Sequence, residues 1–259
     1  MTIALNSMKI DIDKLLSLAK EAGNAILDVY NGPLQNFDIT LKDDKSPLTM
    51  ADRISHEIIL KGLKKIKPSF PVLSEEGSNI PYEVRKNWDY YWCVDPLDGT
   101  KEFISRNGEF TVNIALIHDG HPILGVIYIP VQDTLYYGEP ETGSWKISNG
   151  VPEQIKADSG ASAWISVGSR SHSSPEEEAF LSAFPIVNSV SAGSSLKFCM
   201  IAEGKAHVYY RKGPTMEWDT AAGHAIATLA GAAMTTPEGN PFKYNKPSLL
   251  NGSFLCKTN

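Results

Sequence analysis

The sequence has little that would mark a protein as exported or membrane-spanning. Its three cysteines lie far apart and form no C-x-x-C pair, which favours buried, reduced thiols in a cytosolic protein. No apolar run approaches the roughly 18 residues that a membrane-spanning helix needs. The N-terminus carries Asp11 and Asp13 where an export signal would be apolar. A cytoplasmic location is therefore expected, and the sequence leaves open a peripheral association with the inner face of the plasma membrane.

A surplus of positive charge is also missing. The 24 lysines and arginines are outnumbered by 30 aspartates and glutamates, which gives a net charge of -6. This balance argues against a general binder of nucleic acid or anionic membranes, so an anionic substrate would need a local basic pocket or metal ions. With 259 residues and 42% hydrophobic content, the chain can form one large domain or two smaller ones that share a cleft.

Hydrophobic periodicity predicts two helices in the first part of the chain. An apolar stripe at three- and four-residue spacing predicts a helix from Ile12 to Tyr30. A strand over 37–42 is expected to follow, and then a second helix that begins after Thr49. The inward face of this second helix is predicted to consist of Ala51, Ile54, Ile58, Leu63 and Ile66.

Strands are predicted for most of the remaining first half, and alternating elements for the second. Short apolar runs indicate strands at 71–74 and 90–94 and two hairpins, 111–117 with 123–129 and 135–137 with 145–147. The stretch 149–163, rich in Gly, Ser, Pro and charge, predicts a boundary between an N-terminal α+β half, 1–155, and a C-terminal α/β half, 156–259. In that second half, strands are predicted at 164–167, 186–190 and 206–210, and helices at 175–183, 195–202 and 218–229.

The segment Asp95-Pro96-Leu97-Asp98-Gly99-Thr100 carries the most chemical information. It follows the apolar run 90–94, so two carboxylates are expected on the turn that leaves a buried strand. Pro96 stiffens this turn, Gly99 allows a backbone N–H to approach a ligand, and Thr100 can cap a short helix. Carboxylates attract a hard cation and free N–H groups attract an anion, so the segment can hold Mg2+ on one side and a phosphate on the other.

Three further acidic segments end at predicted element boundaries. Asp52 lies in the first turn of the second helix, Glu75 and Glu76 follow a strand, and Asp219 opens the last helix. Each also has a purely structural interpretation, since Asp52 fits a capping box, Asp219 suits a helix N-terminus and the glutamates suit a surface turn. The segment 95–100 differs, because burial would leave its charges unpaired unless cations offset them.

Metal-assisted hydrolysis is the chemistry that best fits the segment 95–100. A phosphoaspartate phosphatase needs its nucleophile at the position of Pro96, which excludes that covalent route. A calcium loop needs oxygen ligands over about a dozen residues, whereas this segment passes directly into Lys101-Glu102-Phe103. Oxygen ligands favour Mg2+ over zinc, which would prefer His or Cys. Of the six histidines only His224 lies near an acidic motif, and it is expected to pack or face solvent.

Three motifs in this order resemble the signatures of the inositol-monophosphatase-like, lithium-sensitive, metal-dependent phosphatases. They are Ser74-Glu75-Glu76, Asp95-Pro96-Leu97-Asp98-Gly99-Thr100-Lys101-Glu102-Phe103 and Trp218-Asp219-Thr220-Ala221-Ala222-Gly223. Within that superfamily, Lys101-Glu102-Phe103 after Thr100, the segment 193–199 and the segment 215–219 are similar to the bacterial 3'(2'),5'-bisphosphate nucleotidases. The similarity extends from the first helix almost to the C-terminus. It implies a layered α/β/α/β/α sandwich with the site between two halves.

The resemblance also implies roles for individual residues. Two or three Mg2+ ions would bind to the carboxylates of Glu75, Asp95, Asp98 and Asp219 and to the carbonyl of Leu97. Asp52 and Thr100 would orient the attacking water, Glu75 would be a third catalytic residue, and the N–H groups of Gly99 and Thr100 would hold the scissile phosphate. The substrate would therefore contact the residues around the metal ions as well as a second group of residues.

That second group would bind the nucleotide. The resemblance places His172, Gly193, Ser194, Ser195, Lys197 and Arg211 in it. Two of them have structural alternatives, since Ser195 could be only a helix N-cap and Arg211 could belong to an exposed turn.

The implied activity is removal of the 3'-phosphate of adenosine 3',5'-bisphosphate to leave AMP, in sulfur assimilation. An inositol or sugar phosphatase is the alternative within the same superfamily. A non-catalytic regulator that binds phosphate or nucleotide is an alternative from another class. The expected partner is thus a small nucleotide rather than nucleic acid, and a homodimer is left open.

Overall fold

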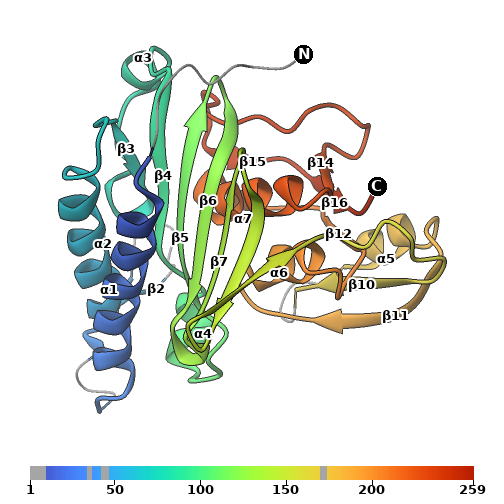
Figure 1. Cartoon of the computed structure of the whole chain (residues 1–259), viewed down its shortest axis with the longest axis horizontal. Coiled ribbons are helices and arrows are strands. Elements are labelled where there is room, and N and C mark those ends of the chain that lie inside the picture. Colours follow the sequence, from blue (N-terminus) through green and yellow to red (C-terminus); the bar gives the residue numbers. More distant parts are fainter. Residues whose placement is uncertain (1–9, 34–36, 42–46, 170–173) are drawn as a thin grey trace.

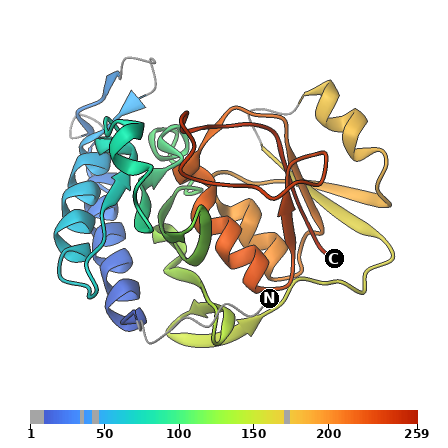
Figure 2. The same ribbon diagram turned by 90° about the horizontal axis from the view of Figure 1, so that it is seen from above.

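The computed structural model describes residues 10–33, 37–41, 47–169 and 174–259, and the structural statements below concern these residues. Two sheets alternate with three layers of helices. Figure 1 shows α1 and α2 on one face of a large sheet, α6 and α7 between this sheet and a second one, and α5 on the far side of the second sheet. Figure 2 shows the same order from above. The predicted α/β/α/β/α sandwich is confirmed.

The first helical layer begins with well-capped helices. In α1 (Ile12–Tyr30) the side chain of Asp11 accepts the N–H of Lys14, and in α2 (Met50–Leu63) Thr49 and Asp52 form the predicted capping box. The predicted inward face of α2 is wrong in part. Ile54 and Ile58 are only half-buried, whereas Asp52, Ser55 and Ile59 are buried. The helix is turned so that its polar positions reach the loop end of β4, where the Ser55 hydroxyl donates to the Pro96 carbonyl at 2.7 Å.

The large sheet has seven strands in the order β3-β4-β5-β6-β7-β8-β9. They are β3 (Val72–Ser74), β4 (Tyr90–Asp98), β5 (Thr111–His118), β6 (His121–Ile129), β7 (Thr134–Glu139), β8 (Gly143–Ser148) and β9 (Val151–Ile155). Strands β3 and β4 are parallel and all other neighbours are antiparallel, which confirms both predicted hairpins. Trp92 and Val94 of β4 pack with the first helical layer, and Tyr91 and Cys93 face α7. Both faces of β4 are therefore buried.

Several short elements complete the first half. They are β1 (Thr40–Leu41), β2 (Pro47–Leu48), η2 (Glu75–Gly77), α3 (Tyr82–Arg85), α4 (Thr100–Ile104) and η3 (Pro130–Gln132). The predicted strand over 37–42 is reduced to the two residues of β1, which pair with β2, while Lys42 lies outside the described residues. Phe37 is fully buried against Phe103, so its apolar character reflects core packing rather than a strand.

The second sheet has five strands in the order β11-β10-β12-β16-β14. Its strands are β10 (Trp164–Gly168), β11 (Ile186–Ser191), β12 (Val208–Arg211), β14 (Ala233–Thr235) and β16 (Phe254–Lys257). The helices of this half are α5 (Pro175–Leu181), α6 (Leu196–Ala202) and α7 (Glu217–Leu229), and a small ribbon joins β13 (Thr215–Met216) to β15 (Leu250–Asn251). The predicted alternation of strands and helices is confirmed.

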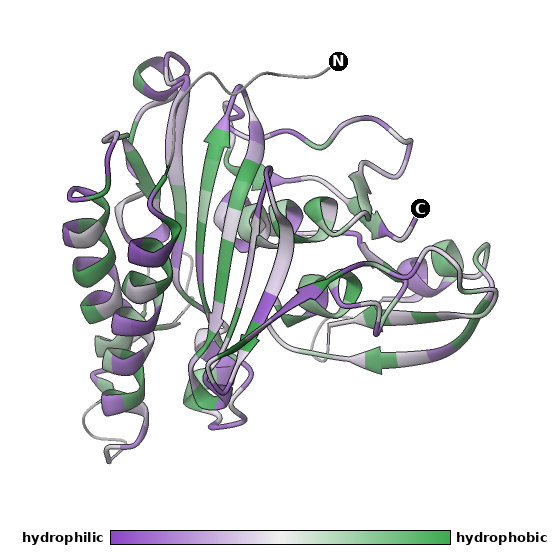
Figure 3. Ribbon diagram, in the orientation of Figure 1, coloured by the Kyte–Doolittle hydropathy of each residue, from purple (hydrophilic) through white to green (hydrophobic). Residues whose placement is uncertain are grey.

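The two sheets share a buried core through α7. A side chain at Gly125 of β6 would lie 2.4 Å from the carbonyl oxygen of Ala222, so helix and sheet are in close contact there. One apolar cluster joins Tyr91 of the first sheet to Tyr209 of the second. In Figure 3 the central strands β5 and β6 carry long apolar stretches. The sheets divide between residues 155 and 164, but the shared core means that the division into halves 1–155 and 156–259 stays a prediction.

The structure also bears on the cysteines and on membrane-spanning helices. All three cysteines are free and buried, as expected for reduced thiols packed in the core. In the described part of the chain, no helix combines the length and the apolar character that crossing a bilayer requires.

Candidate active site

Residues 95–98 are part of β4 rather than of a turn after it. Strand β4 continues to Asp98, and its pairing with β5 shifts register between Asp95 and Asp98. Gly99 then adopts φ of +91° and is the N-cap of α4, so the prediction that Thr100 caps this helix is wrong. The left-handed backbone that ends the strand is accessible to glycine without strain, which explains why the cap falls on Gly99.

Gly99 also lies directly against a loop of the second half. A Cβ atom on Gly99 would be 2.1 Å from the hydroxyl oxygen of Ser194. That hydroxyl is within hydrogen-bonding distance of the carbonyls of Asp98 (2.9 Å) and Glu109 (2.7 Å). The backbone N–H of Gly193 donates to the Glu109 carboxylate at 2.8 Å. The structure therefore brings the predicted phosphate segment and the predicted nucleotide loop together.

Asp98 is oriented by donors that hold one of its two oxygens. Ser195 Oγ and Asn113 Nδ2 donate to Oδ2 at 2.8 and 3.2 Å, and Thr111 Oγ1 lies 3.4 Å away. Asn113 also donates to Ser195 Oγ at 2.8 Å. With Oδ2 engaged, Oδ1 is the oxygen that remains for a cation.

Ser195 lies beside Asp98, inside the candidate site. It stands at the N-cap position of α6 but makes no capping bond, so that structural alternative is wrong. Its buried hydroxyl lies between Asp98 and the Asp219 carbonyl, 3.1 Å away. Direct contact of Ser195 with a nucleotide stays a prediction.

Asn113 and Thr111 were missed by sequence reasoning. Both are fully buried on β5 inside an otherwise apolar run. Two polar residues at alternate positions of a buried strand must find hydrogen-bonding partners on one face, and this pattern was the available signal.

Asp52 and Thr100 lie together as predicted. Asp52 is buried, and its Oδ2 accepts the N–H and the hydroxyl of Thr49 at 2.7 and 2.6 Å. Its Oδ1 accepts the Thr100 hydroxyl at 3.3 Å. Because the Thr100 O–H donates to Asp52, the lone pairs of the Thr100 oxygen can accept a hydrogen bond from a water. That this pair orients the attacking water stays a prediction.

Four carboxylates lie close enough to perturb one another. Burial raises the pKa of Asp95 well above its usual range, and the charges of Glu75, Asp98 and Asp219 raise it further. Burial likewise raises the pKa of Asp219, with added repulsion from Asp98, while a hydrogen bond from the Met216 N–H opposes the rise. Negative charges held in one buried region favour binding of a cation.

The donor set fits Mg2+. Within the ranges that the structure describes, no three acidic, histidine or cysteine side chains already converge into a metal cage. Asp95 instead makes a hydrogen bond with the Glu75 side chain and accepts the Leu97 N–H at 3.1 Å. The available donors are carboxylate and carbonyl oxygens, which hard cations prefer. His224 is not among them, because its buried ring contacts the Tyr244 hydroxyl.

A cavity of about 230 Å³ opens beside Asp98 and Asp219. Both halves of the chain contribute to its wall: Gly99, Glu102, Ser169, Gly193, Ser194, Lys197, Phe198, Tyr209, Arg211, Pro214, Thr215 and Thr220. Four of the predicted nucleotide residues are among these. Arg211 lies within β12 and is buried, so its alternative placement in an exposed turn is wrong. His172 lies outside the described residues.

Lys197 is a buried cation at the wall of this cavity. Its ammonium donates to the carbonyls of Ser194 and Ala192 at 2.7 and 3.1 Å and lies over the Tyr209 ring, 5.4 Å from the centroid. Burial lowers the pKa of Lys197, and the charge of Asp98 opposes this shift. Of the three N–H groups of the Lys197 ammonium, these two carbonyls engage two.

Fold, site and comparisons agree on the class of protein. The chain belongs to the inositol monophosphatase family, whose model matches residues 11–258. It is 48% identical over 244 residues to the 3'(2'),5'-bisphosphate nucleotidase CysQ of Escherichia coli K12, covering 94% of this chain and 98% of that protein. It is 44% identical to CysQ of Buchnera aphidicola, covering 95% and 92%. The solved structure of CysQ from Bacteroides thetaiotaomicron superposes with a TM-score of 0.83 at 44% identity, covering 95% and 97%.

Proposed function

We propose that this chain is a Mg2+-dependent phosphatase that hydrolyses the 3'-phosphate of adenosine 3',5'-bisphosphate to give AMP and inorganic phosphate. One observation carries the proposal: a single cavity is lined by two carboxylates, Asp98 and Asp219, and by two buried cations, Lys197 and Arg211. Hydrolysis of a monophosphate requires only the pair of carboxylates, which can hold the metal ions. A substrate with two separated phosphates can use the pair of cations as well. The identity to bisphosphate nucleotidases supports this substrate class.

The proposed reaction uses residues whose geometry is described above. Two or three Mg2+ ions, held by Glu75, Asp95, Asp98, Asp219 and the Leu97 carbonyl, would supply positive charge that stabilises the reacting phosphate. Thr100, with Asp52 behind it, orients a water whose oxygen attacks phosphorus as the bond to the 3'-oxygen breaks. The water loses a proton as it attacks, and the departing 3'-oxygen takes up a proton to become the ribose hydroxyl. We further propose a cytoplasmic setting in sulfur assimilation.

The purified chain alone is sufficient to test this function. Incubation with adenosine 3',5'-bisphosphate and Mg2+ is expected to release phosphate and leave AMP, identified by chromatography, and a chelator should abolish the release. A non-catalytic regulator would bind the nucleotide in the same buffer and release no phosphate.

Thr100→Ala is expected to lower kcat more than it lowers the affinity for Mg2+. The hydroxyl is proposed to hold the water, since it lies 3.3 Å from Asp52 Oδ1 and is not among the proposed metal ligands. The measurement is kcat as a function of Mg2+ concentration for both proteins. Unchanged kcat with a weakened Mg2+ dependence would show that Thr100 acts on the cation instead.

Lithium is expected to inhibit turnover at modest concentrations. The proposed site is lined by oxygen donors, where a small monovalent ion can replace one Mg2+ without supplying its charge. Inhibition should be measured at subsaturating Mg2+, with sodium at equal ionic strength as the control. Indifference to lithium under these conditions would count against this description of the metal site.

A further inference from the structure

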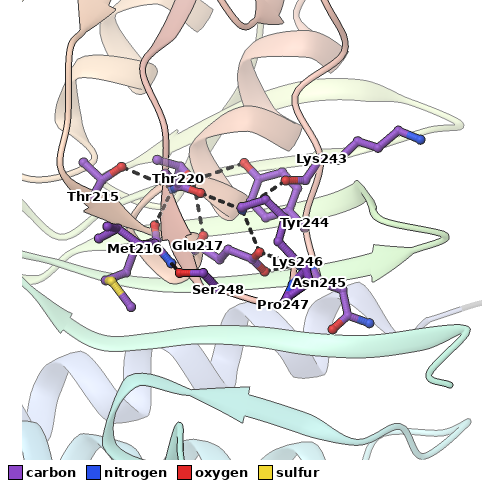
Figure 4. A network of polar contacts seen from close by, with 12 residues as sticks. Thr215, Met216, Glu217, Thr220, Lys243, Tyr244, Asn245, Lys246, Pro247 and Ser248 are labelled. Carbon is purple, nitrogen blue, oxygen red and sulfur yellow. Dashed lines mark hydrogen bonds and ion pairs between the residues drawn. The ribbon is translucent and has the colours of Figure 1, made fainter. Parts of the chain in front are cut away.

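A buried carboxylate that the proposed reaction does not use lies two residues before Asp219. Among the residues that the structure describes, no charged side chain is more buried than that of Glu217, which is 0% exposed. One of its oxygens accepts the N–H of Asn245 at 2.8 Å, and the other accepts the N–H and the ammonium of Lys246 at 3.0 and 2.7 Å. Figure 4 shows these contacts at the start of α7. Desolvation offsets much of the attraction in a buried ion pair. We therefore expect the Glu217–Lys246 pair to affect the positions of the segments it joins more than the free energy of unfolding.

The loop that binds Glu217 is also attached to the first half of the chain. The buried guanidinium of Arg85, at the end of α3, donates to Asn245 Oδ1 and to the carbonyls of Lys246 and Pro247 at 2.9, 2.6 and 2.8 Å. The Asn245 amide donates back to the Arg85 carbonyl at 2.7 Å. Helix α3 leads into β4, the strand with three of the proposed metal ligands, Asp95, the Leu97 carbonyl and Asp98.

The same part of the chain holds the first turn of α7. The Glu217 N–H donates to the Leu249 carbonyl at 3.0 Å, and Asn251 Nδ2 donates to the Met216 carbonyl at 2.7 Å. The Asp219 carboxylate accepts the Met216 N–H at 2.7 Å, so its direction follows the backbone of this turn. Continuous contacts thus lead from α3, through residues 245–251, to Asp219.

We propose that Glu217, paired with Lys246, is a positioning residue that fixes the first turn of α7 relative to β4 and thereby sets Asp219 for Mg2+ binding. The two charges cancel each other, so the pair adds nothing to the net charge of the ligand set. In Figure 4 the Glu217 side chain is directed at Asn245 and Lys246. This role rests on the proposed function, because it requires that Asp219 bind the metal.

Two substitutions with opposite effects on charge test the proposal. Mg2+ binding without substrate is measured by titration calorimetry for Glu217→Gln and Lys246→Met. Positioning predicts that each weakens binding, by about tenfold, the lower end of what loss of a supporting contact costs a metal site. If the pair acted only through charge, the first variant would weaken binding and the second would strengthen it. If it acted only on stability, melting temperatures would fall and both dissociation constants would stay unchanged; either outcome overturns the proposal.

Glu203→Gln is the matched control. Glu203 forms a similar glutamate–lysine pair, with Lys146 at 2.9 Å. This pair lies at the C-terminal end of α6 and does not include the first turn of α7. Glu203→Gln is therefore expected to leave Mg2+ binding unchanged. Should Glu217→Gln fail to fold, Arg85→Lys keeps the charge, removes the forked contacts and is expected to weaken binding by a smaller factor. An unmodified protein that binds no Mg2+ would contradict the proposed function itself, whereas normal binding by all variants contradicts only the positioning role.

Discussion

Asp98→Asn is expected to give a folded protein whose Mg2+-dependent turnover is lower by at least about 10²-fold, the scale of losing a preorganised electrostatic group. Oδ2 of Asp98 is engaged by Ser195 and Asn113, which both donate to it. An asparagine would turn its oxygen toward these donors and its amide NH2 toward the cation. The substitution thus removes a charge and directs N–H groups at the ion, with almost no change of side-chain volume.

The comparison is made on kcat at several Mg2+ concentrations, with circular dichroism to establish folding. Asp28→Asn, the same change at an exposed position of α1, is the control and should behave as the unmodified protein. Turnover of Asp98→Asn at the unmodified level would remove this residue from the metal site.

Lys197→Ala is expected to lower kcat/KM for adenosine 3',5'-bisphosphate by about ten- to a hundredfold. A charge-assisted contact to phosphate in a partly desolvated cavity contributes roughly 1.5 to 3 kcal/mol. The second phosphate does not react, so the contact stabilises ground state and transition state about equally and the loss should appear mainly in KM. A small monophosphate that does not reach Lys197 should be hydrolysed almost as before.

The burial of Lys197 determines how this experiment must be designed. Its ammonium already donates to the carbonyls of Ser194 and Ala192, so removing it leaves two acceptors without their donor and is expected to lower stability. Lys197→Met retains most of the volume and separates packing from charge. The decisive quantity is the ratio of kcat/KM between the bisphosphate and the monophosphate. Equal slowing of both substrates, or of neither, would show that Lys197 supports the loop rather than the substrate.

The local parts of the site could be predicted from the sequence because each is encoded by neighbouring residues. The capping box of Thr49 and Asp52, the strand before Asp95 and the helix that begins near Asp219 all follow from spacing and residue type. The order of strands and helices followed for the same reason. The resemblance of three motifs then assigned these segments to one site.

The contacts that orient the ligands could not be predicted, because they join distant parts of the chain. Arg85 and Asn245 are 160 residues apart, and Asn113 and Ser195 are 82 apart, so no local pattern relates them. The predicted inward face of α2 was wrong in part for a related reason, since the hydroxyl of Ser55 lies inward and donates to the Pro96 carbonyl. Lys197 was expected as a cation available to substrate, and its two carbonyl partners became evident only from the fold.

The measurement that tests the central claim most directly is kcat/KM, in the same Mg2+ buffer, for adenosine 3',5'-bisphosphate, inositol 1-phosphate and fructose 1,6-bisphosphate. The cavity places the buried cations Lys197 and Arg211 beside the carboxylates Asp98 and Asp219. We predict that the nucleotide is hydrolysed with the highest kcat/KM and that its product is AMP. Faster hydrolysis of inositol 1-phosphate or fructose 1,6-bisphosphate would contradict the proposed substrate.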